Sequence, residues 1–316
     1  MKAIVYNQYG NANVLMFDEI EKPQPKNTEI LVKVHTSTVS AAVIWMRKGK
    51  HPSSKLFTFL IRLMYGITKP RNKVLGAEFS GVVEAIGENV KQFKVGDNVY
   101  GTTTGLKQGA YAQYICVPEN WSQGVVALKP DGLTHEEAAA LPIGSMTALH
   151  LLNKTLINKD QSILIYGASG SVGTYAVQLA KYFGGIVTAV CSTKNIELVK
   201  SIGANSVIDY TKTQITECEN KFDIIFDAVG KLPSSTFKPL LKKEGRFVSV
   251  KSITMEKTKY LHFIEKIIDD GRLKPIIDKV YPLENIVKAN EYVELGHKQG
   301  NVVISINPSS NKLANS

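Results

Sequence analysis

A glycine-rich stretch is the feature whose residue types and spacing point most directly to chemistry. The apolar run 162–166 turns through glycines into a segment with helical periodicity. In such a unit Gly167 permits a tight turn, Gly170 lets the backbone approach a pyrophosphate, and Gly173 lets the helix pack on the strand. The pattern departs from G-x-G-x-x-G, because an alanine replaces the first glycine if Gly170 is the second. We predict a dinucleotide site at Gly167, Ala168, Ser169, Gly170, Ser171, Val172 and Gly173. The alternative is a glycine turn without a ligand.

The end of the next apolar run decides which dinucleotide this site would hold. In sites of this kind an acidic residue about 20 positions further on binds the ribose 2′-hydroxyl of NAD. Here the run 186–190 leads into Cys191, Ser192, Thr193 and Lys194, and no acid stands among them. Hydroxyl groups and a cation suit a 2′-phosphate instead. We predict NADPH, bound in part by Ser192 and Lys194. The alternative is that Lys194 begins a solvated helix and that cofactor choice is loose.

The sequence around this loop divides into two kinds of segment, one that alternates strands and helices and one that is rich in short strands. Residues 126–271 alternate strand-like and helical segments, which is typical of βαβ units and a parallel sheet covered on both faces. Residues 1–125 carry short β-type runs separated by Gly and Pro, and β texture returns after residue 271. A capping box of Thr134 and Glu137 marks the first helix of the alternating part. We expect an α/β protein with a β-rich domain (1–125 and 272–316) and a doubly wound parallel-sheet domain (126–271).

Composition excludes several classes of protein. The 316 residues are 44% hydrophobic and 21% charged, unlike a disordered chain, a collagen-like repeat or a disulfide-stapled miniprotein. No stretch approaches the roughly 18 uninterrupted apolar residues of a membrane span. The N-terminus shows no secretory signal, and the three cysteines are too widely spaced for a disulfide framework. We therefore expect reduced thiols and a cytoplasmic protein.

The net charge of +10 is concentrated in one segment, between residues 47 and 73. That segment contains no acidic residue and these cations: Arg47, Lys48, Lys50, Lys55, Arg62, Lys69, Arg71 and Lys73. Residues 56–65 are apolar enough for a helix packed over a cleft with the cations at its flanks. We interpret the cations as the solvated rim of an insertion. A site for an anionic ligand and, less favoured, a nucleic acid or a membrane surface are the alternatives.

Several motifs together resemble the medium-chain dehydrogenase/reductase superfamily, specifically its zinc-free quinone oxidoreductase-like branch. The resemblance covers nearly the whole chain. It rests on residues 74–83 (VLGAEFSGVV), 95–101 (VGDNVYG), 109–114 (GAYAQY), 138–142 (AAALP) and 167–173 (GASGSVG). It implies a GroES-like catalytic domain, a Rossmann domain for NADP and an active site between them.

The resemblance also assigns individual residues. It implies that Thr147 lies near the nicotinamide side of the cofactor and that Tyr210 borders the adenosine phosphate. The segment Ala228, Val229 and Gly230 would lie beneath the nicotinamide ribose and ring. Ser40, Trp45 and Tyr65 would line the substrate cleft, although Trp45 is equally well read as core packing. Asp227 is read as the cap of a strand end. No catalytic acid is assigned.

The resemblance carries no zinc ligands over to this chain. Zinc-dependent relatives have a G-H-E triplet where this sequence has Gly76, Ala77 and Glu78, and no cysteine occurs in the helix expected after Ser40. Tetrahedral zinc needs three or four such ligands. The six histidines show no close ligand pairing, so we predict no metal site.

Without a Lewis acid, oxidation of a simple alcohol is disfavoured, whereas a quinone or an enone accepts hydride at carbon readily. We predict an NADPH-dependent reductase of quinones or α,β-unsaturated carbonyl compounds, acting on a small-molecule substrate and not on nucleic acid. Two alternatives stay open: zinc-free alcohol and carbonyl oxidoreduction, and a nonenzymatic NADPH-binding protein with a structural, sensing or RNA-contacting role.

The parallel sheet is expected to be shortened. We predict a helix over 235–242 and a fifth strand over 246–250, followed by only seven residues before a helix at Thr258. A helical crossover to a sixth strand alone needs about a dozen residues. In relatives that sixth strand pairs across a dimer, so a homodimer is possible here but not through that strand.

Overall fold

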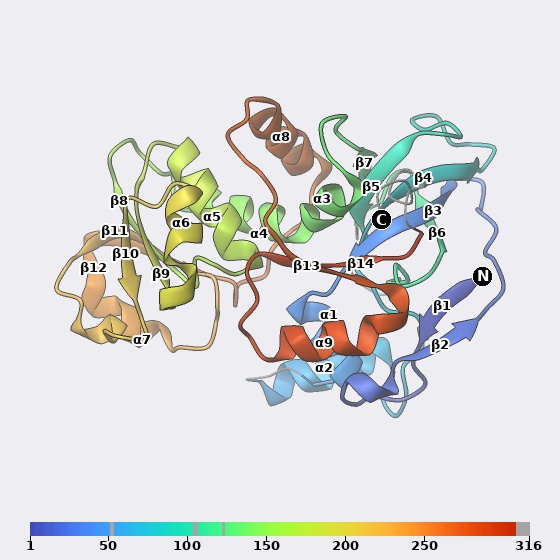
Figure 1. The fold of residues 1–316 in the computed structure, drawn as a ribbon, viewed down its shortest axis with the longest axis horizontal. Helices are drawn as coiled ribbons and strands as arrows, with labels where there is room; N and C mark the ends of the chain where they lie inside the picture. Colours follow the sequence, from blue (N-terminus) through green and yellow to red (C-terminus); the bar gives the residue numbers. More distant parts are fainter. Residues whose placement is uncertain (51–53, 104–106, 122–123, 308–316) are drawn as a thin grey trace. The chain divides into compact units, whose positions relative to one another are not determined.

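The computed structural model describes residues 1–50, 54–103, 107–121 and 124–307. The chain divides into two compact units, Met1–Pro142 with Ile277–Ser316, and Ile143–Ile276. The first unit therefore contains both ends of the described chain, and the second is a single continuous insertion (Figure 1). Residues 126–142, which the sequence pattern placed with the second unit, belong to the first.

The first unit is built on a mixed sheet whose main path runs β13-β14-β3-β4-β5-β7, with β6 pairing β3. Its described strands pair antiparallel except β13 and β14, which run parallel. A separate ribbon joins β1 to β2. The strands are β1 (Lys2–Val5), β2 (Met16–Glu19), β3 (Glu29–Thr38), β4 (Glu78–Ile86), β5 (Asn98–Thr102), β6 (Tyr114–Pro118), β7 (Val125–Leu128), β13 (Ile277–Pro282) and β14 (Asn301–Ser305). Ile30, Val32 and Val34 on β3 are fully buried, so the core of this unit lies against the middle strands. The returning strand β14 pairs antiparallel with β3, so the C-terminal segment contributes a strand to this sheet.

Among its described residues the first unit has the α-helices α1 (Ala41–Lys48), α2 (Lys55–Tyr65), α3 (His135–Ala140) and α9 (Ile286–Glu294). The expected capping box begins α3, because the Glu137 amide donates to the Thr134 hydroxyl at 3.2 Å and the Thr134 amide donates to the Glu137 carboxylate at 2.9 Å. This helix packs on β3 and β4. Segment 126–142 thereby stays with the first unit: β7 pairs with β5 at its start, and α3 packs on the sheet at its end.

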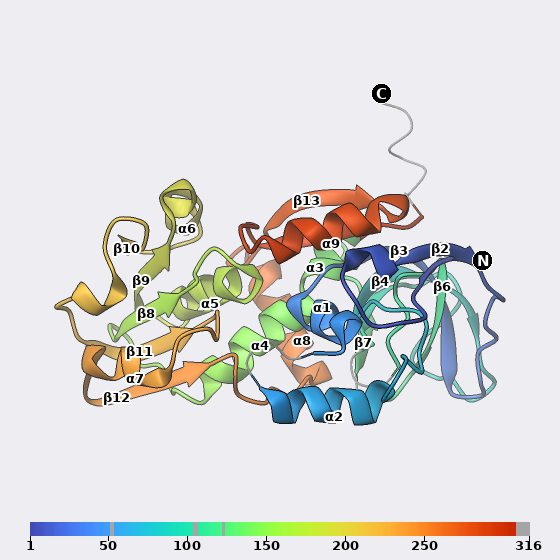
Figure 2. The same cartoon turned by 90° about the horizontal axis from the view of Figure 1, so that it is seen from below.

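The second unit is a parallel five-stranded sheet in the order β10-β9-β8-β11-β12. Its strands are β8 (Ser162–Tyr166), β9 (Ile186–Cys191), β10 (Ser206–Asp209), β11 (Phe222–Asp227) and β12 (Leu241–Ser249). Its helices are α4 (Pro142–Asn153, which begins at the boundary), α5 (Ser171–Tyr182), α6 (Ile196–Ser201), α7 (Ser234–Phe237) and α8 (Thr258–Asp269). Helices α5 and α6 lie against β8, β9 and β10, as Figure 2 shows. The fold class predicted from the sequence is confirmed, including the shortened sheet, because β12 is the last strand before α8.

One local prediction in this unit is wrong. The helix expected over 235–242 ends earlier, with α7 followed by a 3-10 turn that ends at Leu240. Leu241 already pairs with Phe222 on β11, and the register shifts before Ile224 pairs with Arg246. Pairing with β11 therefore overrides the helical pattern of the leucines and lysines, and β12 begins five residues before the predicted strand.

Candidate cofactor-binding site

The glycine-rich loop lies where the strand order of the parallel sheet reverses. Strand β8 is central, β9 lies on one side and β11 on the other, so the loops that follow β8 and β11 leave the sheet in opposite directions. Ligands of open parallel sheets bind at the carboxyl ends of the strands at such a switch point. The amide groups of Gly167 and Ala168 both donate to the Val190 carbonyl at 3.1 Å, which fixes the loop against the end of β9.

Each glycine of the loop has a distinct structural role. Gly167 has φ +80°, and a Cβ there would lie 2.3 Å from Val229 Cγ2. A Cβ on Gly173 would lie 2.1 Å from the Gly167 carbonyl oxygen, so only glycine lets α5 approach the loop this closely. A Cβ on Gly170 would meet nothing nearer than the same oxygen at 3.5 Å. The interior of the protein thus requires glycine at 167 and 173 but leaves open space beside Gly170.

Helix α5 presents its N-terminus at this open space. Gly170 is the N-cap, with extended backbone, and no side-chain cap covers the helix end. The Thr174 amide makes the bond to the Gly170 carbonyl at 2.9 Å. The preceding amide groups of the first turn therefore have no carbonyl acceptor within the helix, and with the helix dipole they favour an anion.

The turn after β9 is tied to this loop by a residue that sequence reasoning did not single out. The Asn195 side-chain amide donates to the Ser169 hydroxyl at 2.8 Å. Both Asn195 and Ser192 are buried, whereas Lys194, between them, is exposed. Ser169, Ser192 and Lys194, all predicted site residues, thus belong to one connected edge of the unit.

An acidic side chain, Asp209, also reaches this edge from the next strand. Parallel pairing sets Asp209 at the end of β10 beside Cys191 at the end of β9. The Asp209 carboxylate accepts hydrogen bonds from the Thr193 hydroxyl at 2.5 Å and the Thr211 hydroxyl at 2.7 Å. These hydrogen bonds, with that of Thr193 the strongest, lower the pKa of Asp209. The Asp209 carboxylate therefore places a negative charge beside the end of β9, although the segment 191–194 itself contains no acidic residue, and this carboxylate binds Thr193. The predicted neighbour Tyr210 is exposed beside it.

The loop after β11 is organised by the buried carboxylate of Asp227. Its Oδ1 accepts hydrogen bonds from the amides of Val229 and Gly230 at 3.0 and 2.9 Å, and its Oδ2 accepts one from the Ser249 hydroxyl at 2.8 Å. Asp227 therefore holds the turn Ala228–Gly230 and joins it to β12, in agreement with its interpretation as a strand-end cap. The packing of Gly167 against Val229 brings this predicted segment to the glycine-rich loop.

Thr147 lies on α4, one turn beyond a close helix contact. A Cβ on Gly144 would lie 2.8 Å from the Tyr175 ring and 3.0 Å from the Ser171 hydroxyl, so α4 approaches the first turns of α5. Thr147 follows at the i+3 position of the same helix and is half-buried. Thr147 therefore lies on the part of α4 that is near α5, the helix that begins at the glycine-rich loop.

The three residues predicted for the substrate cleft all belong to the first unit. The Ser40 hydroxyl caps α1 by accepting a hydrogen bond from the Val43 amide at 3.4 Å. Trp45 lies on the same helix and is half-buried. Tyr65 ends α2 and is buried, which raises its pKa. Ser40 thus has a structural role in capping, and its placement in a cleft, like that of Trp45 and Tyr65, stays a prediction.

A pair of histidines forms a half-buried titratable cluster in the first unit. The rings of His35 and His135 stack with their centroids 4.5 Å apart, and His135 Nδ1 is 2.7 Å from the Ser80 hydroxyl. Burial, with the neighbouring His35 as a further cause, lowers the pKa of His135 to about 4. Burial also lowers the pKa of His35. Both imidazoles are therefore neutral at pH 7.

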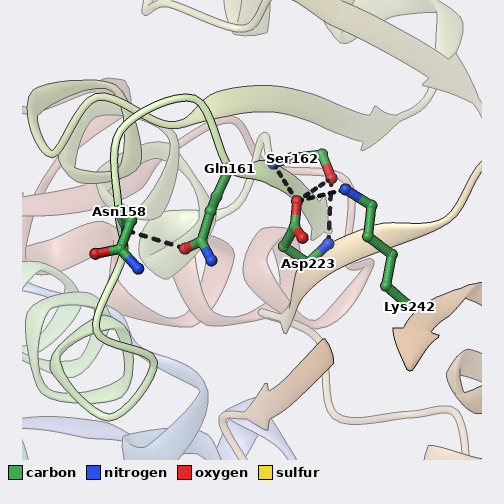
Figure 3. A network of polar contacts seen from close by, with 5 residues as sticks. All are labelled: Asn158, Gln161, Ser162, Asp223 and Lys242. Carbon is green, nitrogen blue, oxygen red and sulfur yellow. Dashed lines mark hydrogen bonds and ion pairs between the residues drawn. The ribbon is translucent and has the colours of Figure 1, made fainter. Parts of the chain in front are cut away.

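A polar network at the opposite, amino-terminal edge of the parallel sheet has a different character (Figure 3). Asp223 on β11 accepts hydrogen bonds from the Ser162 amide at 2.8 Å, the Ser162 hydroxyl at 2.7 Å and Lys242 at 2.7 Å. Burial opposes ionisation, but the bonds from Lys242 and Ser162 outweigh it and lower the pKa of Asp223 to about 2. The network joins β8, β11 and β12 away from the glycine-rich loop, so we interpret it as structural.

The triplet 76–78 has an alanine where the zinc-binding triplet G-H-E has a histidine. Ala77 offers no ligand atom, and Glu78 accepts a hydrogen bond from the Thr38 hydroxyl. Across the described ranges, no three His, Cys, Asp or Glu side chains gather closely enough to hold a metal ion.

Comparison with known proteins identifies the family. The family described as "Alcohol dehydrogenase GroES-like domain" matches residues 26–130, and the one described as "Zinc-binding dehydrogenase" matches residues 171–268 and, through a second profile, 252–304. A chloroplastic NADPH-dependent alkenal/one oxidoreductase of Arabidopsis thaliana is 32% identical over 96% of this chain and 79% of its own. A 2-methylene-furan-3-one reductase of Solanum lycopersicum is 33% identical over the same shares of the two chains.

The same assignment follows from solved structures. The quinone oxidoreductase of Coxiella burnetii superposes with a TM-score of 0.82 at 25% identity, covering 97% of this chain and 99% of that one. No helix in the described part of the chain is long and apolar enough to cross a membrane. By its two matched domains, its fold and its relatives, the chain belongs to the medium-chain dehydrogenase/reductase superfamily of oxidoreductases, in the quinone oxidoreductase-like branch.

Proposed function

We propose that this chain is an NADPH-dependent reductase of quinones or α,β-unsaturated carbonyl compounds and that it works without zinc. The observation that carries the proposal is the open space beside Gly170 at the uncapped N-terminus of α5. Intramolecular packing does not require glycine there, whereas close approach of a pyrophosphate does. The names of the relatives, an alkenal/one oxidoreductase and a quinone oxidoreductase, support the substrate class.

In this proposal the second unit holds the cofactor through its own backbone and four side chains. The first-turn amides of α5 bind the pyrophosphate, and Ser192, Lys194 and Tyr210 bind the adenosine 2′-phosphate. The turn Ala228–Gly230, held by Asp227, supports the nicotinamide ribose, with Thr147 at the nicotinamide side. When bound here, the cofactor would supply a hydride and solvent a proton, so that the acceptor would be reduced and NADP⁺ formed.

The zinc-free part of the proposal rests on residue types. Ala77 cannot ligate a metal, so no Lewis acid is available at that position to lower the pKa of an alcohol. An activated acceptor needs no such help, and positioning of the two reactants supplies most of the acceleration. The expected substrate is therefore a quinone or an enone rather than a simple alcohol.

Two measurements test the proposal. Metal-stripped protein should oxidise NADPH in the presence of a quinone or an enone, with no loss on addition of a chelator, and should bind NADPH more tightly than NADH. Turnover that requires added Zn²⁺, or turnover of alcohols alone, would show the zinc-free reductase to be wrong. Binding of NADPH without turnover on a panel of quinones, enones and aldehydes would instead favour a nonenzymatic role.

We also propose that any homodimer forms elsewhere than through β12. This strand pairs with β11 alone in the fully described second unit, so its outer edge is open. Lys242, Lys243, Glu244 and Arg246 lie along it, and charged side chains on an edge strand disfavour strand addition. Light scattering should give the same mass for the unaltered chain and for an Arg246→Pro variant; a dimer that this variant dissociates would contradict the proposal.

A further inference from the structure

Helix α2 turns its more polar face toward the protein and its apolar face toward solvent, the reverse of an ordinary amphipathic surface helix. Thr58, Ile61, Arg62 and Tyr65 follow the i, i+3, i+4, i+7 spacing of a single face, and they are the less exposed residues of the helix. The opposite face carries large apolar side chains in water: Leu56 is 67%, Phe59 62% and Leu63 48% exposed. Phe57, Leu60 and Met64 extend the same exposed surface. The apolar residues of this segment are thus exposed.

This orientation is fixed by contacts on the inner face. Arg62 lies over the Tyr9 ring at 4.0 Å, and its Nε donates to the Gly49 carbonyl at 2.8 Å. The Tyr9 hydroxyl donates to the Gly66 carbonyl at 2.7 Å. Rotating the helix to bury its leucines would break these contacts and expose Tyr65. These contacts therefore fix the rotation of α2 that leaves its apolar face exposed.

Cations surround this apolar face. Lys50 and Lys55 lie at the N-terminal side of α2, and Lys69, Arg71 and Lys73 follow its C-terminal turn; all five are exposed. The turn is tight, since the Arg71 amide donates to the Tyr65 carbonyl at 2.7 Å, which returns these cations to the helix end. No ion pair involves any of the five within the described residues, and no acidic residue occurs between residues 47 and 73.

We propose that α2 and its flanking cations dock the protein on an anionic lipid bilayer, as a helix lying in the interface. An apolar stripe between cationic flanks is the pattern of interfacial helices: the stripe enters the headgroup boundary and the cations meet lipid charge. At 11 residues the helix is about 16 Å long, too short to span a bilayer. The bilayer surface thus accounts for both the apolar face and the unpaired charge.

Charge also decides against a second copy of the chain as the occupant. In a two-fold dimer through α2, the same surface meets itself, so five cations of one protomer would face five of the other. Like charges brought together at an interface oppose association. An anionic bilayer has the opposite sign and attracts the same cations.

The experiment is co-sedimentation of the full-length protein with vesicles. Vesicles of phosphatidylcholine with about a third phosphatidylglycerol should bind the protein at low ionic strength, and pure phosphatidylcholine vesicles should bind it at least tenfold less, because each lysine or arginine near the surface contributes about 1 kcal/mol. Binding to the mixed vesicles should weaken as salt is raised.

Matched variants locate the contact. Leu56→Glu/Phe59→Glu/Leu63→Glu should reduce binding to the mixed vesicles at least tenfold, and Lys55→Glu/Lys69→Glu/Arg71→Glu should remove the preference for anionic lipid. Leu295→Glu replaces an equally exposed leucine, 67% exposed, and should bind as the unaltered protein does. Circular dichroism and the urea unfolding midpoint report whether each variant is folded.

Three results would overturn the proposal. The first is a folded, unaltered protein that binds neither kind of vesicle. The second is vesicle binding that the folded α2 variants leave unchanged. The third is a protein that is dimeric in solution and that the Leu56→Glu/Phe59→Glu/Leu63→Glu variant makes monomeric without any vesicle binding, which would make a second copy the occupant.

Discussion

The side-chain amide of Asn195 lies 2.8 Å from the Ser169 hydroxyl and donates a hydrogen bond to it. This bond joins the turn after β9, where the adenosine phosphate is proposed to bind, to the loop proposed for the pyrophosphate. Asn195→Ala should weaken NADPH binding about fivefold, the equivalent of one hydrogen bond near 1 kcal/mol, because the two parts of the site lose their mutual alignment. Calorimetric titration with NADPH measures this, with the exposed Asn158→Ala as the control. Equal affinities for the two variants would show that the bond does not organise the site.

The glycines of the loop should separate binding from folding. Gly170→Ala places its Cβ in open space and should leave the unfolding midpoint almost unchanged while reducing NADPH affinity more than tenfold. Gly173→Ala places its Cβ 2.1 Å from a backbone oxygen and should cost about 2 kcal/mol of stability as well as binding. Gly132→Ala, whose Cβ meets nothing within 4 Å, is the control. A Gly170→Ala protein that binds NADPH normally would remove the main support for the proposed site.

Cofactor preference should respond in opposite directions to two changes at the end of β9. Lys194→Ala removes the proposed cation and should lower the ratio of NADPH to NADH affinity about tenfold, since a charge-assisted hydrogen bond contributes about 1.5 kcal/mol. Asp209→Asn removes a carboxylate whose pKa is lowered by Thr193, and so should raise the same ratio by reducing repulsion of the 2′-phosphate. Dissociation constants for both cofactors decide the matter. If neither substitution changes the ratio of NADPH to NADH affinity, the adenosine 2′-phosphate does not bind at the end of β9.

Acid should destabilise the first unit through its histidine pair. The pKa of His135 is lowered by burial from 6.5 to about 4, so the folded protein binds fewer protons than the unfolded chain between these values. The stability contributed by the neutral imidazole is complete above pH 6.5 and is lost as the pH falls toward 4, by about 2 kcal/mol. Urea unfolding at pH 7 and pH 5 should show a smaller difference for His135→Asn than for the exposed-residue control His262→Asn. An identical difference in both variants would exclude His135 as the cause.

The amino-edge network of Figure 3 should contribute to stability without affecting the cofactor. Asp223→Ala leaves Ser162 and Lys242 without their shared acceptor and should lower the free energy of unfolding by about 2 kcal/mol. The pKa of Asp223 is depressed to about 2, so this stability is complete above pH 3.8 and lost as the pH falls through 2. NADPH affinity of the folded variant should be unchanged. A large loss of affinity would mean that the two edges of the sheet are coupled.

The sequence predicted those features of the candidate site that depend on local backbone geometry. A tight turn needs a glycine at 167 and close helix packing needs one at 173, and the structure has both. Asn195 and Asp209 were missed because their contacts cross between elements: Asp209 reaches the end of β9 only through the parallel register of β10, which no spacing along the chain reveals. The orientation of α2 was likewise not predictable from its composition, because a contact from Tyr9 to Arg62 selects the face that turns inward.

The pairing of β14 with β3 also sets the order in which the molecule can be completed during synthesis. Thr38 on β3 pairs with Val303 on β14, and the whole parallel-sheet unit lies between these two residues in the sequence. During synthesis β3 therefore emerges long before the strand that pairs with it. The inserted unit is continuous and can fold first, as domains generally do as the chain emerges. The nascent first unit, meanwhile, exposes an unpaired edge of β3 for most of translation. In that interval Thr36, Ser37 and Thr38 lack the strand that pairs with them in the folded protein.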